Sequence, residues 1–188
     1  MLELWLGNTF LIDLILDFGN YSFFCILFFY FYKKEFINQI QFFFMCILML
    51  TPFLFNNSYF DWRIIPDQSK YFSTAYTIRE EIFSNSKVEI TDLSKMKMII
   101  ASYIFAYSPL LNIETFKSIG FLNRFLFLSS TIFFFKKKRI ESTLFLITIL
   151  SPSLTFYSSV SLREILIILS MIWAFYFFTE KRYILFLI

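Results

Sequence analysis

The 188-residue sequence lacks several residue types on which common protein chemistries depend. It has no histidine, which excludes histidine metal sites, Ser-His-Asp triads and histidine proton relays. Its two cysteines, Cys25 and Cys46, lie in apolar runs without CxxC spacing, which excludes a zinc or iron–sulfur centre and predicts packing roles. With only three glycines, it has no glycine-rich phosphate loop. We therefore expect no cofactor and no bound metal.

Charge is also scarce. Only 16% of the residues are charged, against about 25% in a typical soluble domain, whereas 58% are hydrophobic and 30 are phenylalanine. Such a chain cannot cover a soluble surface, so a soluble enzyme, a disordered tail and a disulfide-rich secreted module are excluded. The net charge of +3 is small and clustered, which argues against a nucleic-acid partner. The composition predicts an all-α polytopic transmembrane bundle in contact with a lipid bilayer.

The apolar runs locate the expected membrane crossings, since about 20 apolar residues span a hydrocarbon core of about 30 Å. We expect one membrane domain over residues 1–188, with five to six spans. The expected full spans are 10–32, 38–56, 118–135, 142–160 and 164–179. The apolar run from Tyr183 to Ile188 is interpreted either as the start of a further, truncated span or as a short anchor.

The segment 98–113 is harder to assign, because it has 16 residues and contains Ser108-Pro109. Three basic clusters, at 33–34, 136–139 and 181–182, should all be cytoplasmic by the positive-inside rule. They fall on one side only if 98–113 re-enters the membrane or lies at its interface. We therefore favour five full spans, an outside N-terminus and an outer loop over 57–97, with a full crossing of 98–113 as the alternative.

The outer loop contains an expected amphipathic helix over 69–84, because its apolar residues recur at helical spacing. Pro66 biases Ile65 toward an extended backbone, and Asp67 or Ser69 is expected to cap the helix. This helix would lie on the membrane surface or cover a cavity between spans.

Several charged residues near the membrane have two interpretations each. Arg163 and Glu164 form either a binding site or an ordinary pair at a helix start, and Arg79 lies either in a site or on a solvated face. Asp13 and Asp17 lie one helical turn apart, as a paired acidic site or as the interfacial start of the first span. Arg124 is expected to snorkel or to pair locally.

Three stretches resemble bacterial surface-polysaccharide membrane proteins: Ile64–Glu80, Ile119–Arg124 and Ser151–Glu164. The last is similar to a small-residue, Leu-Arg-acidic turn in polymerase-like proteins of exopolysaccharide and O-antigen clusters. The resemblance implies a polymerase or glycosyltransferase-like enzyme of the bacterial inner membrane, acting on polyprenyl-diphosphate-linked sugars at the outer face. Because such enzymes have more spans than this chain can hold, it also implies a fragment or one half of an assembly.

The same resemblance implies roles for particular residues. Arg79 and Arg163, assisted by Lys70 and Tyr71, would bind the polyprenyl diphosphate. Asp67 or Glu164 would assist the acceptor hydroxyl. We expect Asp67, Arg79 and Arg163 to line one outward cavity.

A non-enzymatic alternative fits the same composition. An accessory subunit of a respiratory complex, encoded in an AT-rich organelle genome, would be small, rich in phenylalanine and without histidine. It would lie in the mitochondrial inner membrane, bury its apolar faces against other membrane subunits and need no active site. The polar middle loop with its expected helix favours the enzyme.

Overall fold

The computed structural model describes residues 2–55, 66–84, 96–113, 115–137, 140–160 and 162–180, and within these ranges every regular element is a helix. The elements are α1 (Leu2–Lys33), α2 (Gln39–Leu48), α3 (Thr51–Phe55), α4 (Pro66–Phe83), α5 (Met96–Ala106), α6 (Phe116–Lys136), α7 (Ser142–Leu150), α8 (Pro152–Ser159) and α9 (Glu164–Thr179). The predicted all-α class is confirmed. Some of the predicted features lie outside the described residues. These are the further span from Tyr183, the basic pairs at 138–139 and 181–182, and parts of the outer loop.

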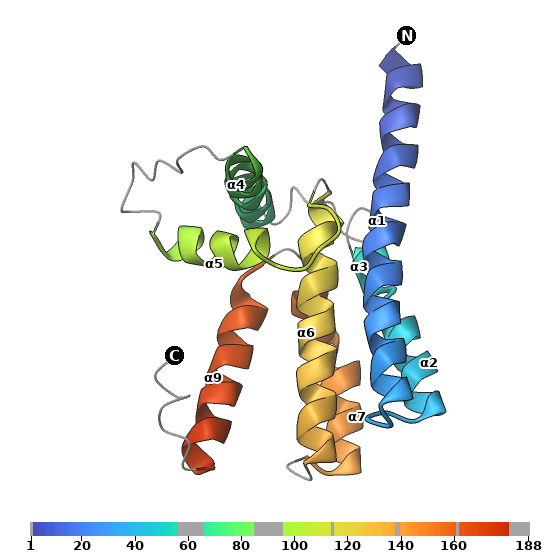
Figure 1. Ribbon diagram of the computed structural model, residues 1–188, viewed down its shortest axis with the longest axis vertical. Coiled ribbons are helices and arrows are strands. Elements are labelled where there is room, and N and C mark those ends of the chain that lie inside the picture. Colours follow the sequence, from blue (N-terminus) through green and yellow to red (C-terminus); the bar gives the residue numbers. More distant parts are fainter. Residues whose placement is uncertain are drawn as a thin grey trace.

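The helices form a bundle whose upper end is covered by α4 and α5 (Figure 1). The long helix α6 stands between α1 and α9, and α5 lies roughly perpendicular to these helices, above the upper end of α9. The predicted helix over 69–84 is α4, which begins three residues earlier, at Pro66. Asp67 and Ser69 therefore lie inside the helix and not at the N-cap position that precedes it.

Fewer helices qualify as membrane spans than the five or six that the sequence predicted. Among the described residues, two helical segments are long and apolar enough to cross a membrane, Leu11–Lys33 and Lys117–Lys136. A third crossing is obtained only if α8 and α9, which meet at a bend of 111°, count as one broken span. The segment 98–113 forms the 11-residue helix α5 and then leaves helical geometry.

The predicted spans 38–56 and 142–160 are each broken in two. Proline lacks an N–H and clashes with the preceding turn, so it is tolerated only in the first turn of a helix. Pro52 is the second residue of α3 and Pro152 the first of α8, so each proline begins a new helix. The chain thus uses one plan twice: a long helix, a turn with basic residues, a short helix, a Thr-Pro or Ser-Pro break, and a second short helix.

Arg124, on α6, links the break between α2 and α3 to the C-terminal end of α8. Its side chain is 0% exposed, so the expectation that it snorkels is wrong. Its Nε donates to the carbonyl of Leu48, 3.2 Å away at the end of α2, and its Nη1 donates to the hydroxyl of Ser158, 2.8 Å away in the last turn of α8. Among the described residues it has no carboxylate partner. Helix C-termini carry partial negative charge, so the ends of α2 and α8 partly compensate the buried cation.

The neighbouring Asn123 extends this attachment to the start of α9. Its Nδ2 donates to the carbonyls of Val160 and Leu162, at 2.9 and 2.8 Å, which lie in the bend between α8 and α9. The rest of the core is largely aromatic, as in the stacked pair Phe24–Phe125 between α1 and α6. In the apolar stretch of α6 that could cross a membrane, 72% is buried in the protein, against 22% in the corresponding stretch of α1. Helix α6 is therefore central in the bundle, and α1 is peripheral.

We expect Arg124→Met to destabilise the bundle. The substitution removes the hydrogen bonds from Arg124 to the Leu48 carbonyl and the Ser158 hydroxyl, and hydrogen bonds of a charged group contribute about 1.5–3 kcal/mol each. Thermal unfolding in detergent should show a clearly lower Tm, with Lys136→Met, which removes an exposed charge from the same helix, as the matched control. An unchanged Tm in Arg124→Met would show that this attachment is dispensable.

Candidate functional site

Two of the predicted site residues meet where α4 crosses the start of α9. Tyr71 of α4 is only 5% exposed, and the guanidinium of Arg163 lies 5.9 Å from the centre of its ring. Phe105 of α5 packs edge-on against the same ring at 6.4 Å. Glu164, the first residue of α9, follows Arg163 directly. Tyr71, Arg163 and Glu164 are called the Tyr71 site below.

The Tyr71 site contains unused hydrogen-bonding atoms. Arg163 Nε and Glu164 Oε2 are buried, and neither has a hydrogen-bond partner among the described residues. Buried polar atoms are normally satisfied, because leaving one without a partner costs free energy. A cationic donor and a carboxylate acceptor at adjacent positions can bind a ligand that carries both a negative charge and a hydroxyl group.

The electrostatics of Tyr71 show that Asp67 belongs to the same region. Burial raises the pKa of the Tyr71 phenol above its ordinary value, and the negative charges of Glu164 and Asp67 raise it further. The positive charge of Arg163 opposes this shift. The structure thus places Tyr71, Arg163 and Glu164 together, and the charge of Asp67 acts on the same phenol. The resemblance had implied one site for all four residues.

Asp67 and Lys70 themselves form a surface ion pair. Lys70 Nζ lies 3.1 Å from Asp67 Oδ1, and both side chains are more than half exposed. Glu164 Oε2 is buried and has no partner among the described residues, whereas Asp67 is exposed and paired, so Glu164 is the better placed of the two to contact a ligand. No group of three potential metal-ligating side chains occurs within the described part of the chain.

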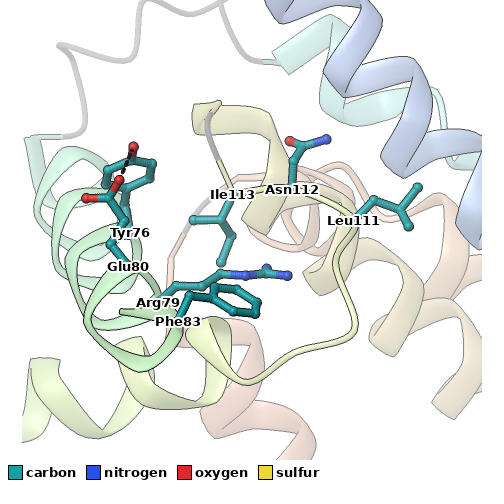
Figure 2. Close-up of a pocket in the computed structure, with 7 residues that line it drawn as sticks. All are labelled: Tyr76, Arg79, Glu80, Phe83, Leu111, Asn112 and Ile113. Carbon is teal, nitrogen blue, oxygen red and sulfur yellow. Dashed lines mark hydrogen bonds between the residues drawn. The ribbon is translucent and has the colours of Figure 1, made fainter. Parts of the chain in front are cut away.

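Arg79 occupies a pocket of its own, about 210 Å³ in volume, between α4 and the stretch 111–113 (Figure 2). Its Nη2 donates to the Leu110 carbonyl at 2.6 Å, and the guanidinium lies 5.8 Å from the ring centre of Phe83. Burial lowers the pKa of the Arg79 guanidinium. The lining residues of this Arg79 pocket are Tyr76, Arg79, Glu80, Phe83, Leu111, Asn112 and Ile113. Asp67 and Arg163 are not among them, so a cavity shared by all three remains a prediction.

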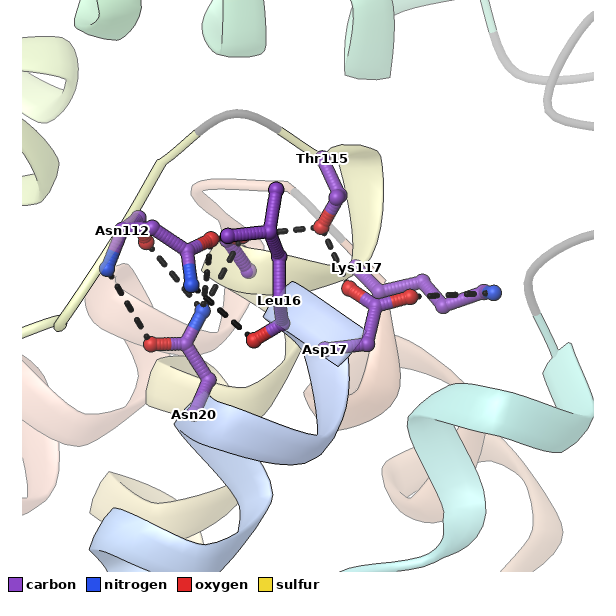
Figure 3. A network of polar contacts seen from close by, with 7 residues as sticks. Leu16, Asp17, Asn20, Asn112, Thr115 and Lys117 are labelled. Carbon is purple, nitrogen blue, oxygen red and sulfur yellow. Dashed lines mark hydrogen bonds and ion pairs between the residues drawn. The ribbon is translucent and has the colours of Figure 1, made fainter. Parts of the chain in front are cut away.

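A buried polar network, which the sequence analysis missed, fixes the wall of the Arg79 pocket (Figure 3). Asn20 of α1 accepts from the backbone N–H of Leu111 at 3.1 Å and donates to the Asn112 carbonyl, also at 3.1 Å. Asn112 in turn donates to the Leu16 carbonyl at 2.9 Å. This α1 clasp attaches the stretch 111–113 to the first span. A polar Asn20 one helical turn after Asp17 was the signal in the sequence.

Asp17 completes the α1 clasp. Its carboxylate is 0% exposed, accepts from the Thr115 hydroxyl at 2.5 Å and pairs with Lys117 at 3.1 Å. Asp13, one turn earlier, is exposed, so the two acids form no common site. The alternative of an interfacial helix start fits Asp13 and fails for Asp17, which is buried against α6.

A double-mutant cycle should detect this ion pair. Lys117→Met leaves the Asp17 carboxylate buried without a cation, which we expect to cost about 2–4 kcal/mol, less than for a fully buried pair because Lys117 is partly exposed. Adding Asp17→Asn should recover part of the loss. Thermal unfolding in detergent measures both, and Asp13→Asn is the matched control. Strictly additive losses would contradict a direct interaction.

Comparisons with protein-family models, with curated proteins and with solved structures find no match to this chain. A functional assignment therefore depends on the geometry of the Tyr71 site and the Arg79 pocket, together with the chemistry of their side chains.

Proposed function

We propose that this chain is an integral membrane protein that transfers a sugar from a polyprenyl diphosphate carrier, at the membrane face covered by α4 and α5. In this proposal it serves surface-polysaccharide assembly in a bacterial inner membrane. The observation that carries the proposal is the Tyr71 site, where a half-buried arginine and a half-buried glutamate each have a buried polar atom without a partner among the described residues.

The path of the chain supports this orientation. The turns after α1 and α6, which contain Lys33, Lys34, Lys136 and Lys137, both lie at the lower end of the bundle (Figure 1). The roof of α4 and α5 lies at the upper end. By the positive-inside rule the lower end is cytoplasmic and the roof faces outward. In this arrangement α1, α2–α3, α6, α7–α8 and α9 make five passes, two of them broken.

Cysteine labelling tests this arrangement. In a Cys25→Ser/Cys46→Ser background expressed in bacteria, we expect a membrane-impermeant maleimide to label Thr77→Cys, on an exposed position of α4, in intact spheroplasts. Gln39→Cys and Glu141→Cys, at the lower end, should be labelled only after lysis, because the membrane shields them. Labelling of all three from one side would contradict the five-pass arrangement.

The Tyr71 site supplies the groups that glycosyl transfer needs. The guanidinium of Arg163 offers a planar fork that suits a diphosphate, and its contact with Tyr71 orients it. As the acceptor oxygen forms its bond to the anomeric carbon, the bond from that carbon to the diphosphate oxygen breaks. Glu164 takes the proton of the acceptor hydroxyl, and Arg163 stabilises the negative charge that develops on the departing polyprenyl diphosphate.

Binding and transfer separate the roles of these two residues. With farnesyl diphosphate as a short-chain probe, we expect Arg163→Ala to weaken binding about 10- to 100-fold, because hydrogen bonds to a charged group contribute about 1.5–3 kcal/mol. Lys34→Ala, which removes a cation at the opposite end, should bind as the wild type does. Glu164→Gln should retain the probe and lose sugar transfer, measured with a polyprenyl-diphosphate-linked sugar.

Unchanged binding in Arg163→Ala would overturn the proposal. Purification in mild detergent gives an independent outcome. Recovery of the chain as a fixed-ratio component of a large multi-subunit complex, without bound polyprenyl lipids, would favour the accessory-subunit alternative over an enzyme.

A further inference from the structure

The guanidinium of Arg79 is held in place with half of its fork unused. Nη2 is committed to the Leu110 carbonyl, and the ring of Phe83 lies beneath the guanidinium. Nη1 is buried and has no hydrogen-bond partner among the described residues. Figure 2 shows the guanidinium extending toward the stretch that contains Leu111 and Ile113, on the opposite wall of the pocket. A side chain fixed in this way is preorganised for an anion, since little conformational freedom is lost on binding.

The rim of the pocket adds a negative charge. Glu80 lies on the exposed side of α4 and accepts from the Tyr76 hydroxyl at 2.7 Å. A carboxylate at the rim repels a multiply charged phosphate and accepts hydrogen bonds from hydroxyl groups. The ligand that suits both ends of the pocket carries one negative charge and several hydroxyls. At about 210 Å³ the pocket is smaller than the roughly 300–1,000 Å³ of sites for drug-sized ligands, which suits a single sugar unit.

The Arg79 pocket also lies apart from the Tyr71 site. Arg79 follows Tyr71 by eight residues on α4, which corresponds to about 12 Å along the helix axis. The lining of the Arg79 pocket includes neither Tyr71 nor Arg163, so we assign the two arginines to two groups of one extended ligand, in place of the shared diphosphate that the resemblance implied. The α1 clasp, through Asn20, holds the backbone of Leu111 and Asn112 and so keeps the far wall of the pocket in position.

We infer that the Arg79 pocket binds a carboxylate-bearing sugar unit of the acceptor glycan. Arg79 pairs with the sugar carboxylate, and Glu80 accepts from its hydroxyls. This inference rests on the proposed transfer of sugars at the Tyr71 site, and it names an acidic polysaccharide as the class of substrate.

Ligand-detected NMR on the full chain in lipid nanodiscs tests the inference with three probes: D-glucuronate, D-glucose and inorganic phosphate. We expect glucuronate to bind in the millimolar range and more tightly than either other probe. Arg79→Met should weaken glucuronate binding at least about tenfold. Arg163→Ala should leave the affinity for glucuronate unchanged and weaken the binding of farnesyl diphosphate. A loss of binding at the Tyr71 site is thereby distinguished from a loss of binding at the Arg79 pocket.

A second variant keeps the test decisive if Arg79→Met does not fold. Glu80→Gln removes the negative charge at the rim, so phosphate should bind more tightly than in the wild type while glucuronate loses selectivity against it. Equal binding of glucose and glucuronate by the wild-type chain would overturn the inference. Tighter binding of phosphate than of glucuronate would overturn it as well, and would assign the pocket to a phosphate group.

Discussion

The fold depends on one buried cation. The guanidinium of Arg124 lies where the C-terminal ends of α2 and α8 meet α6, and it donates to a carbonyl or hydroxyl at each end. A helix that breaks inside an apolar bundle leaves carbonyls without partners, which is tolerated only where protein groups satisfy them. Arg124 provides one donor to the Leu48 carbonyl, at the break between α2 and α3, and another to the Ser158 hydroxyl at the end of α8. The partial negative charge of the helix ends, in turn, reduces the cost of burying the cation without a carboxylate.

The Tyr71 site depends on Asn123, the residue that precedes Arg124 on α6. Asn123 holds two carbonyls in the bend between α8 and α9, and this bend presents Arg163 and Glu164 to the underside of α4. The same turn of α6 therefore fixes both the broken helices and the charged residues of the Tyr71 site. Binding groups supported by a central helix keep their geometry better than groups on a free loop.

The sequence predicted the helical class, the two long helices and α4, because composition and apolar periodicity report directly on these features. It predicted more unbroken spans than the two helices that are long and apolar enough to cross a membrane. An uncharged run such as 36–60 has the length of a span whether or not Pro52 divides it. The break between α2 and α3 depends on Arg124, which is 72 residues away from Pro52 in the chain. The contact between Tyr71 and Arg163, and that between Asn20 and Asn112, join residues about ninety positions apart. No local pattern encodes such pairs, whereas each residue type was recognisable as a polar group in an apolar setting.

The α1 clasp also has a mechanical consequence. α1 is the less buried of the two long helices, so fewer protein contacts oppose a change of its tilt in a bilayer of different thickness. Leu111 donates to Asn20 of this helix, Asn112 accepts from Asn20, and Asn112 donates to the Leu16 carbonyl, so the stretch 111–113 is attached to α1. A thinner or thicker membrane that tilts α1 must therefore carry one wall of the Arg79 pocket with it or break these bonds. The shape of the pocket is in this way linked to the lipid composition of the membrane.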